Sequence, residues 1–149
     1  MIINVYNQTK CRLPQSQKEI SNILKKAAKL RNKSALWEIT VSIVNDKAMR
    51  TLNKKYRDQD RVTDVLSFSQ QEGDKMILSP ENKNYLGDIV ICYPQIRRQA
   101  KQFGQSIKKE FGLMLIHGFL HLLGYSDQSK AAWQKMEKIQ NKIFSKIYG

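Results

Sequence analysis

Two histidines stand out because their spacing suits a metal ion. The chain contains only His117 and His121, and in a helix the i, i+4 spacing places both imidazoles on one face, about one turn apart. A metal site needs a further ligand. Gly124 allows the chain to leave the helix and turn back, so that Asp127 can approach the same point from the following loop. The pattern H-x3-H-x5-D predicts two imidazoles and one carboxylate around a metal, with positions left open for water or substrate.

The same histidines have a simpler interpretation. H-x3-H alone is common, and two histidines on an apolar helix can be core residues that hydrogen-bond to backbone or carboxylates. The zincin motif H-E-x-x-H does not apply, because Gly118 stands where its catalytic glutamate would be. A zinc peptidase of that type is therefore not expected.

The net charge points to a polyanionic partner. Lys and Arg number 26 against 13 Asp and Glu, which gives a formal charge of +13. Such a surplus in a small domain attracts phosphate backbones and releases their counterions. An anionic membrane surface is the competing partner, but no segment joins a basic face to an apolar anchor. A lysine-rich composition that serves only solubility, or reflects an AT-rich genome, is the remaining alternative.

The remaining composition favours a cytosolic globular domain. Hydrophobic residues make up 41% of the chain, and the longest nearly continuous apolar stretch, Phe111 to Leu123, is too short to span a bilayer. The first residues lack the basic and apolar regions of a secretory signal, so we expect a cytoplasmic protein without membrane contact. Cys11 and Cys92 form no CxxC pair, and we expect both to be small buried hydrophobes.

Periodicity indicates which elements must position the histidines. We expect strands at 2–6, 38–44, 65–68 and 85–93, and helices at 14–30, 46–57, 94–104, 106–123 and 129–147, with a polar loop containing Gly73, Pro80 and Asn84 between the last two strands. The 106–123 segment is apolar on nearly all sides, which is typical of a central helix covered by other elements. Residues 1–149 are therefore predicted to form a single α+β domain, a small mixed β-sheet covered by helices, with the metal-binding motif on the central buried helix.

Three sequence blocks resemble a known family. HGFLHLLGYSDQ at 117–128 is similar to the signature HGxLHLxGYDH of the YbeY endoribonucleases, which mature ribosomal RNA. Tyr56 and Arg57 followed by VTDVLSF at 62–68 resemble that family's YR…TDVLSF block, and LGDIVI at 86–91 resembles its LGDIxI strand. Met136 and Glu137 also match a pattern in the family's last helix. The order and separation of the blocks extend the resemblance over essentially all 149 residues.

The chain departs from the family at the third metal ligand. The resemblance implies three histidines around one divalent ion, with zinc the most expected, and Asp127 occupies the place of the third. Aspartate is a competent zinc ligand. Its negative charge lowers the net charge of the centre, which weakens polarisation of bound water and favours harder ions such as Mn²⁺ or Fe²⁺. The alternative is that Asp127 points away and the metal is lost.

Arg57 is the candidate catalytic residue. The resemblance implies an arginine beside the metal in a basic cleft, where a guanidinium can hold a phosphate bidentately and counter its developing charge. Without the resemblance, Arg57 would be interpreted as a solvated residue at a helix end.

Other polar residues near the motifs have structural interpretations. Asp64 and Asp88 adjoin strands, where turn or cap hydrogen bonds are their ordinary roles, and Thr63 and Ser67 are expected to be structural rather than nucleophilic. Glu110 either orients a ligand or pairs with Lys108 or Lys109.

The implied activity is metal-dependent hydrolysis of single-stranded RNA. By resemblance, the roles are 16S rRNA 3′ end maturation and ribosome quality control, with the small ribosomal subunit and assembly factors as partners. Surrounding cationic side chains would hold the RNA backbone without reading its sequence. The leading alternative is a catalytically weakened or inactive RNA- or ribosome-binding assembly factor. A hydrolase for a small anionic substrate is less expected, because +13 exceeds what one small anion needs.

Overall fold

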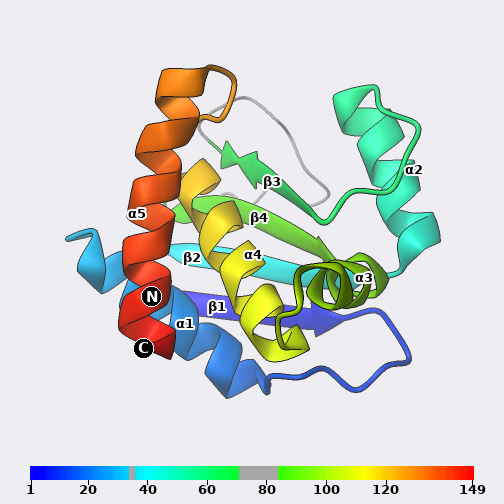
Figure 1. The fold of residues 1–149 in the computed structure, drawn as a ribbon, viewed down its shortest axis with the longest axis horizontal. Coiled ribbons are helices and arrows are strands. Elements are labelled where there is room, and N and C mark those ends of the chain that lie inside the picture. Colours follow the sequence, from blue (N-terminus) through cyan, green and yellow to red (C-terminus); the bar gives the residue numbers. More distant parts are fainter. Residues whose placement is uncertain (34–35, 71–83) are drawn as a thin grey trace.

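The computed structural model describes residues 1–33, 36–70 and 84–149, which form four strands and five helices (Figure 1). In chain order the elements are β1 Ile2–Asn7, α1 Gln17–Leu30, β2 Glu38–Val44, α2 Asp46–Arg57, β3 Val65–Ser69, β4 Tyr85–Cys92, α3 Tyr93–Phe103, α4 Ile107–Leu122 and α5 Lys130–Tyr148. The predicted elements are confirmed. Helix α1 begins later than predicted, because Ser16 provides its N-terminal cap. Gly73 and Pro80 of the predicted loop lie outside the described residues.

The sheet is mixed, as predicted. Its strand order is β1-β2-β4-β3. Strands β1, β2 and β4 run parallel, whereas β3 pairs antiparallel with β4. Side chains alternate across β4, so Ile89 and Ile91 join one core cluster while Val90 and Cys92 join another. The larger cluster lies under α1, α4 and α5, and the smaller one is covered by α2 through Met49.

Helix α4 carries the histidines through the centre of the molecule. Figure 1 shows it lying over the sheet between α5 and α3, and it contacts α1, α3, α5, β3 and β4. Ser106 caps its start by accepting a hydrogen bond from the Lys109 N–H. Ten of its residues are buried, which explains why its sequence is apolar on nearly all sides. Neighbours on several sides therefore determine where the two imidazoles point.

Gly118 sets how closely α4 approaches the sheet. A Cβ at this position would lie 2.9 Å from Ile89 Cγ2, 3.1 Å from Ser67 Oγ and 3.3 Å from Val65 Cγ2. Ser67 Oγ also donates a hydrogen bond of 2.9 Å to the Gly118 carbonyl. The position that carries glutamate in zincins is thus a tight contact between helix and sheet in this chain.

Replacing Gly118 by alanine is expected to lower the free energy of unfolding by about 1–3 kcal/mol, because overpacking outweighs the better helix propensity of alanine. Urea denaturation followed by circular dichroism measures the change. Unchanged or increased stability would show that α4 can move off the sheet without loss.

The two cysteines differ in burial. Cys92 is buried, as predicted, and its Sγ lies 3.3 Å from Asp46 Oδ1. The prediction of burial is wrong for Cys11, which is exposed in the connection between β1 and α1. From this connection it is Leu13, and not Cys11, that packs against the core. Across the described residues, no helix combines the length and apolarity that crossing a membrane requires.

Candidate metal centre

The two histidines face each other, as their spacing predicts. His117 Nε2 and His121 Nε2 lie 3.1 Å apart. The ring centroids are 4.6 Å apart, and the ring planes are inclined by 82°. Both side chains are partly buried at the point where α4 meets α5 and the loop after α4. The pair therefore presents two ring nitrogens to one point.

The other nitrogen of each ring contacts an oxygen acceptor. His117 Nδ1 lies 2.7 Å from Gln140 Oε1, and His121 Nδ1 lies 2.9 Å from the Tyr125 carbonyl oxygen. Neither oxygen can donate, so each Nδ1 carries the proton in these contacts. In a neutral imidazole, Nε2 then presents a lone pair. Acceptors on the distal nitrogen are the usual way in which proteins orient metal-binding histidines.

This arrangement favours a cation between the rings. Two Nε2 lone pairs that face each other at 3.1 Å cannot form a hydrogen bond without an added proton. Two nitrogens bound to one tetrahedral zinc ion at about 2.0–2.1 Å lie about 3.3 Å apart. The observed separation is close to that value. The donor set therefore fits a divalent metal with little rearrangement of the rings.

Asp127 approaches the same point from the loop after α4. Its Oδ2 lies 3.5 Å from His121 Nε2, and the candidate ligand atoms of His117, His121 and Asp127 all lie within 4.8 Å of one another. Gly124 adopts a φ of 97°, and its N–H donates to the His121 carbonyl, so the chain reverses directly after the helix. The structure brings the three predicted ligands together. The Asp127 side chain is 48% exposed, which leaves this side of the group open to solvent.

Distant residues hold the loop that carries Asp127. Arg31, which caps the end of α1, donates through Nη2 to the Tyr125 hydroxyl. Its guanidinium carbon lies 5.6 Å from the centre of the Tyr125 ring, and Lys135 Nζ of α5 lies 5.9 Å from it. These contacts fix Tyr125 at both its ring and its backbone carbonyl, which meets His121. The loop is thus positioned by α1 and α5 as well as by α4.

Arg57 lines a pocket that also contains His121 and Asp127. The pocket has a volume of about 530 Å³ and lies between the start of β3 and the loop after α4. Arg57 Nη2 donates to the Ser67 carbonyl at 2.7 Å, and the guanidinium carbon lies 4.8 Å from the centre of the Phe68 ring. The arginine is therefore held against β3 and is not a freely solvated residue at a helix end. The planar donor group, His121 and Asp127 share one cavity.

The remaining acidic candidates have structural partners. Asp64 Oδ1 accepts from the Val65 N–H at 2.7 Å, and Asp88 accepts from the Tyr85 hydroxyl at 2.8 Å. Burial raises the pKa of the Asp88 carboxyl above its usual range. Glu110 pairs with neither neighbouring lysine, because its carboxylate points into the protein and accepts from Gln105 Nε2 at 3.3 Å. Lys108 instead forms an ion pair of 2.9 Å with Glu19.

The hydroxyl groups near the site also have structural roles. Ser67 Oγ donates to the Gly118 carbonyl, and Thr63 Oγ1 lies 3.4 Å from Asp64 Oδ1. In neither of these contacts is the partner of the hydroxyl group His117 or His121. The expectation that both residues are structural agrees with these contacts.

Sequence reasoning did not find Gln140 or Tyr125. Gln140 is buried, with 5% exposure, although it is polar. It lies on α5 between Met136 and Ile143, on the apolar stripe that faces the core. A polar residue at a core position of an amphipathic helix is the signal that points to a partner such as His117.

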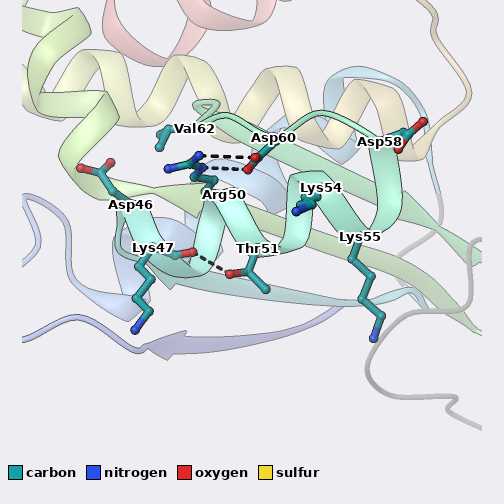
Figure 2. Close-up of a pocket in the computed structure, with 9 residues that line it drawn as sticks. All are labelled: Asp46, Lys47, Arg50, Thr51, Lys54, Lys55, Asp58, Asp60 and Val62. Carbon is teal, nitrogen blue, oxygen red and sulfur yellow. Dashed lines mark hydrogen bonds and ion pairs between the residues drawn. The ribbon is translucent and has the colours of Figure 1, made fainter.

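A larger depression lies on α2, away from the histidines (Figure 2). Its cationic side chains include Lys47, Arg50 and Lys54. Arg50 is paired with Asp60 at 2.8 Å, as the dashed lines in Figure 2 mark, so part of this charge is neutralised. None of the three predicted metal ligands lines this depression. Its ion pair is exposed and contributes little to the stability of the fold. The predicted chemistry therefore belongs to the smaller pocket at His121.

Comparison with known proteins gives matches over nearly the whole chain. Residues 2–148 match the family described as Endoribonuclease YbeY. The chain is 38% identical over 151 residues to a protein named Endoribonuclease YbeY from Limosilactobacillus reuteri, covering 96% of this chain and 95% of that protein. It is 34% identical over 152 residues to the protein of that name from Bacillus subtilis, covering 100% and 96%. The solution structure of TM1509 from Thermotoga maritima is similar with a TM-score of 0.59 and 26% identity, covering 97% of this chain and 91% of that one.

Proposed function

Because this chain belongs to the Endoribonuclease YbeY family, we propose that it is a metal-dependent endoribonuclease that cleaves single-stranded RNA. The observation that carries the proposal is the pair of Nε2 atoms that face each other at 3.1 Å, each imidazole oriented by an acceptor on its Nδ1. The formal charge of +13 supports a polyanionic substrate.

His117, His121 and Asp127 would hold the ion. When bound, a divalent ion supplies Lewis-acid stabilisation of negative charge at the phosphate. Gln140 and the Tyr125 carbonyl keep the Nδ1 protons in place, so both Nε2 atoms remain available as ligands. The Asp127 side of the group is open to solvent, so substrate would reach the ion from this side.

Arg57 would engage the phosphate beside the ion. Its guanidinium is held by the Ser67 carbonyl and the Phe68 ring, so it needs little reorganisation when the charge on the phosphate grows. A planar fork of donors can bind two phosphate oxygens at once, which orients the phosphodiester. Arg57 is thus the proposed charge-stabilising residue of the reaction.

The proposed biological substrate is ribosomal RNA. The family supports a role in rRNA processing. The finer assignments, namely 16S rRNA 3′ end maturation, ribosome quality control, the small ribosomal subunit and assembly factors as partners, and the cytoplasm as compartment, rest on the resemblance alone. Zinc is the proposed metal, with Mn²⁺ or Fe²⁺ favoured if the carboxylate of Asp127 is a ligand.

Cleavage of a single-stranded RNA with and without added Zn²⁺, Mn²⁺ or Mg²⁺ tests the proposal, together with elemental analysis of protein purified without chelator. We expect one divalent ion per chain and metal-dependent cleavage. Tight RNA binding without cleavage under any of these ions would identify a non-enzymatic RNA- or ribosome-binding factor instead.

Replacing Asp127 by alanine is expected to lower metal affinity by about tenfold or more. Loss of a residue that only orients a metal ligand already lowers the affinity by about this factor, and loss of the ligand itself lowers it at least as much. Asp127→His is expected to shift preference toward Zn²⁺, because imidazole is a softer donor than carboxylate. Competition with a chromophoric chelator measures both affinities. Gln128→Ala, a neutral change in the same pocket, is the matched control. Unchanged affinity in Asp127→Ala would exclude the carboxylate as a ligand.

A further inference from the structure

A second cavity lies beside His117. It has a volume of about 470 Å³ and is formed by α3, α4, α5 and the residue before β3. Its lining includes Asp64, Gln99, Gln105, Glu110, Trp133 and Gln140. The mechanism proposed above uses only one of these side chains, and only through the contact of that side chain with His117.

Two residues that line this cavity contact His117. Gln140 lines the cavity, and its Oε1 meets His117 Nδ1 at 2.7 Å. The Trp133 ring centroid lies 6.2 Å from that of His117. Asp64 lines this cavity and the next residue, Val65, lines the Arg57 pocket, so the two linings adjoin along the chain at the start of β3. An extended ligand that crosses the histidines can therefore reach both.

The charge of the cavity is opposite to that of the chain. No lysine or arginine is among the described residues that line it, although the chain has a formal charge of +13. Its charged side chains are the carboxylates of Asp64 and Glu110. A phosphate group is repelled by this lining, so the cavity suits an uncharged part of a ligand that carries N–H donors.

Two buried polar side chains present hydrogen-bonding groups to the cavity. Gln140 is 5% exposed, and because its oxygen accepts from His117, its amide nitrogen is the group that it can offer to a ligand acceptor. Glu110 is 2% exposed and accepts one hydrogen bond of 3.3 Å from Gln105. Burial and the nearby Asp64 raise the pKa of Glu110. A ligand N–H directed at this carboxylate and an acceptor directed at Gln140 would satisfy both groups.

Aromatic rings complete the cavity. Trp133 forms part of its wall, and Phe103 lies at α3 with 65% of its surface exposed. Proteins bind unstacked bases of single-stranded RNA by stacking them on such rings and by hydrogen bonds to the base edges. The combination of rings, amides and carboxylates is the chemistry that a nucleobase requires.

We propose that this cavity receives one unstacked nucleobase of the RNA strand whose backbone crosses the histidine pair, and that it prefers bases with an exocyclic amino group over uracil. This inference rests on the proposed RNA substrate. An amino group donates to the Glu110 carboxylate, while a ring nitrogen or carbonyl accepts from Gln140 Nε2. Uracil has no exocyclic amino group, and its one ring N–H on this edge lies between two carbonyl oxygens. These oxygens would be repelled by the carboxylate of Glu110.

The test uses Trp133 as the reporter. The chain has two tryptophans, so Trp37→Phe leaves Trp133 alone. The metal-loaded variant is titrated with 2′-O-methyl oligo-C and oligo-U of equal length, and a denaturing gel verifies that both remain intact. We expect oligo-C to quench Trp133 fluorescence at about tenfold lower concentration than oligo-U.

Glu110→Gln tests the origin of the preference. We expect this change to bring the oligo-C to oligo-U ratio close to one, because the amide no longer selects for donors. Glu137→Gln, the same change at an exposed position on α5, is the matched control and is expected to keep the ratio. Fluorescence polarisation of labelled oligonucleotides repeats the comparison without any tryptophan replacement, so the result does not depend on the folding of Trp37→Phe.

The outcomes separate this inference from the proposed function. Equal binding of oligo-C and oligo-U, or a preference that survives Glu110→Gln, would overturn the base site. RNA cleavage by the wild-type protein without any change in Trp133 fluorescence would also overturn it, while the nuclease function stands. Quenching with the expected preference, together with no cleavage of unmodified single-stranded RNA by the wild-type protein, would support the base site and remove the nuclease function. Quenching by an oligo-arginine peptide and not by RNA would assign the cavity to a cationic protein partner and overturn the inference.

Discussion

Replacing His117 or His121 by alanine is expected to remove the divalent ion and to lower RNA cleavage by about a thousandfold or more. Each change deletes one of two nitrogens that lie 3.1 Å apart and face one point. Metal ions contribute several kcal/mol of charge stabilisation at a phosphate, and each 1.4 kcal/mol corresponds to about tenfold in rate. Elemental analysis and cleavage of one single-stranded RNA by each variant measure the two effects.

The fold is expected to survive both histidine changes. Each imidazole is only partly buried, and its hydrogen bond goes to the Gln140 side chain or to the Tyr125 carbonyl. The circular dichroism spectra of both variants are therefore expected to match that of the wild type. Gln128→Ala, which changes a neighbouring residue of the same pocket, is expected to retain its metal. Full metal content in both histidine variants would mean that the imidazoles are core residues, which is the alternative that the sequence left open.

Replacing Arg57 by alanine is expected to slow RNA cleavage by about a hundredfold or more with the metal content unchanged. Loss of one preorganised donor to a developing negative charge typically has this effect. Arg57→Lys is expected to recover part of the rate, because it keeps the charge but not the planar fork of donors. RNA binding is expected to weaken far less, since many lysines and arginines share the backbone contacts.

Cleavage and binding are measured on one RNA across a salt series. Arg61→Ala is the matched control, because Arg61 is an exposed arginine near α2 that does not line the His121 pocket. Equal and modest losses of binding and cleavage in Arg57→Ala would make Arg57 one phosphate contact among many. Wild-type cleavage in that variant would remove it from the mechanism.

Local sequence patterns are sufficient to predict the helices and strands and the shared face of the two histidines. Strand β2 was predictable because Ile39, Val41 and Ile43 alternate with polar residues, and α4 because its apolar run ends at a glycine. The spacing of His117 and His121 fixes their relative direction within one helix, since both follow the same helical periodicity. These properties depend on residues close in the chain, so local pattern is sufficient to predict them.

Which distant residues meet depends on how the elements pack against one another. The antiparallel pairing of β3 with β4, the contact of Gln140 with His117 and the contact of Arg31 with Tyr125 join residues far apart in sequence. The same packing turned Glu110 toward Gln105 and left Cys11 exposed, against expectation. Periodicity assigns a residue to a face, but many partners could cover that face. The partner is selected by how whole elements pack together, and local sequence does not encode that choice.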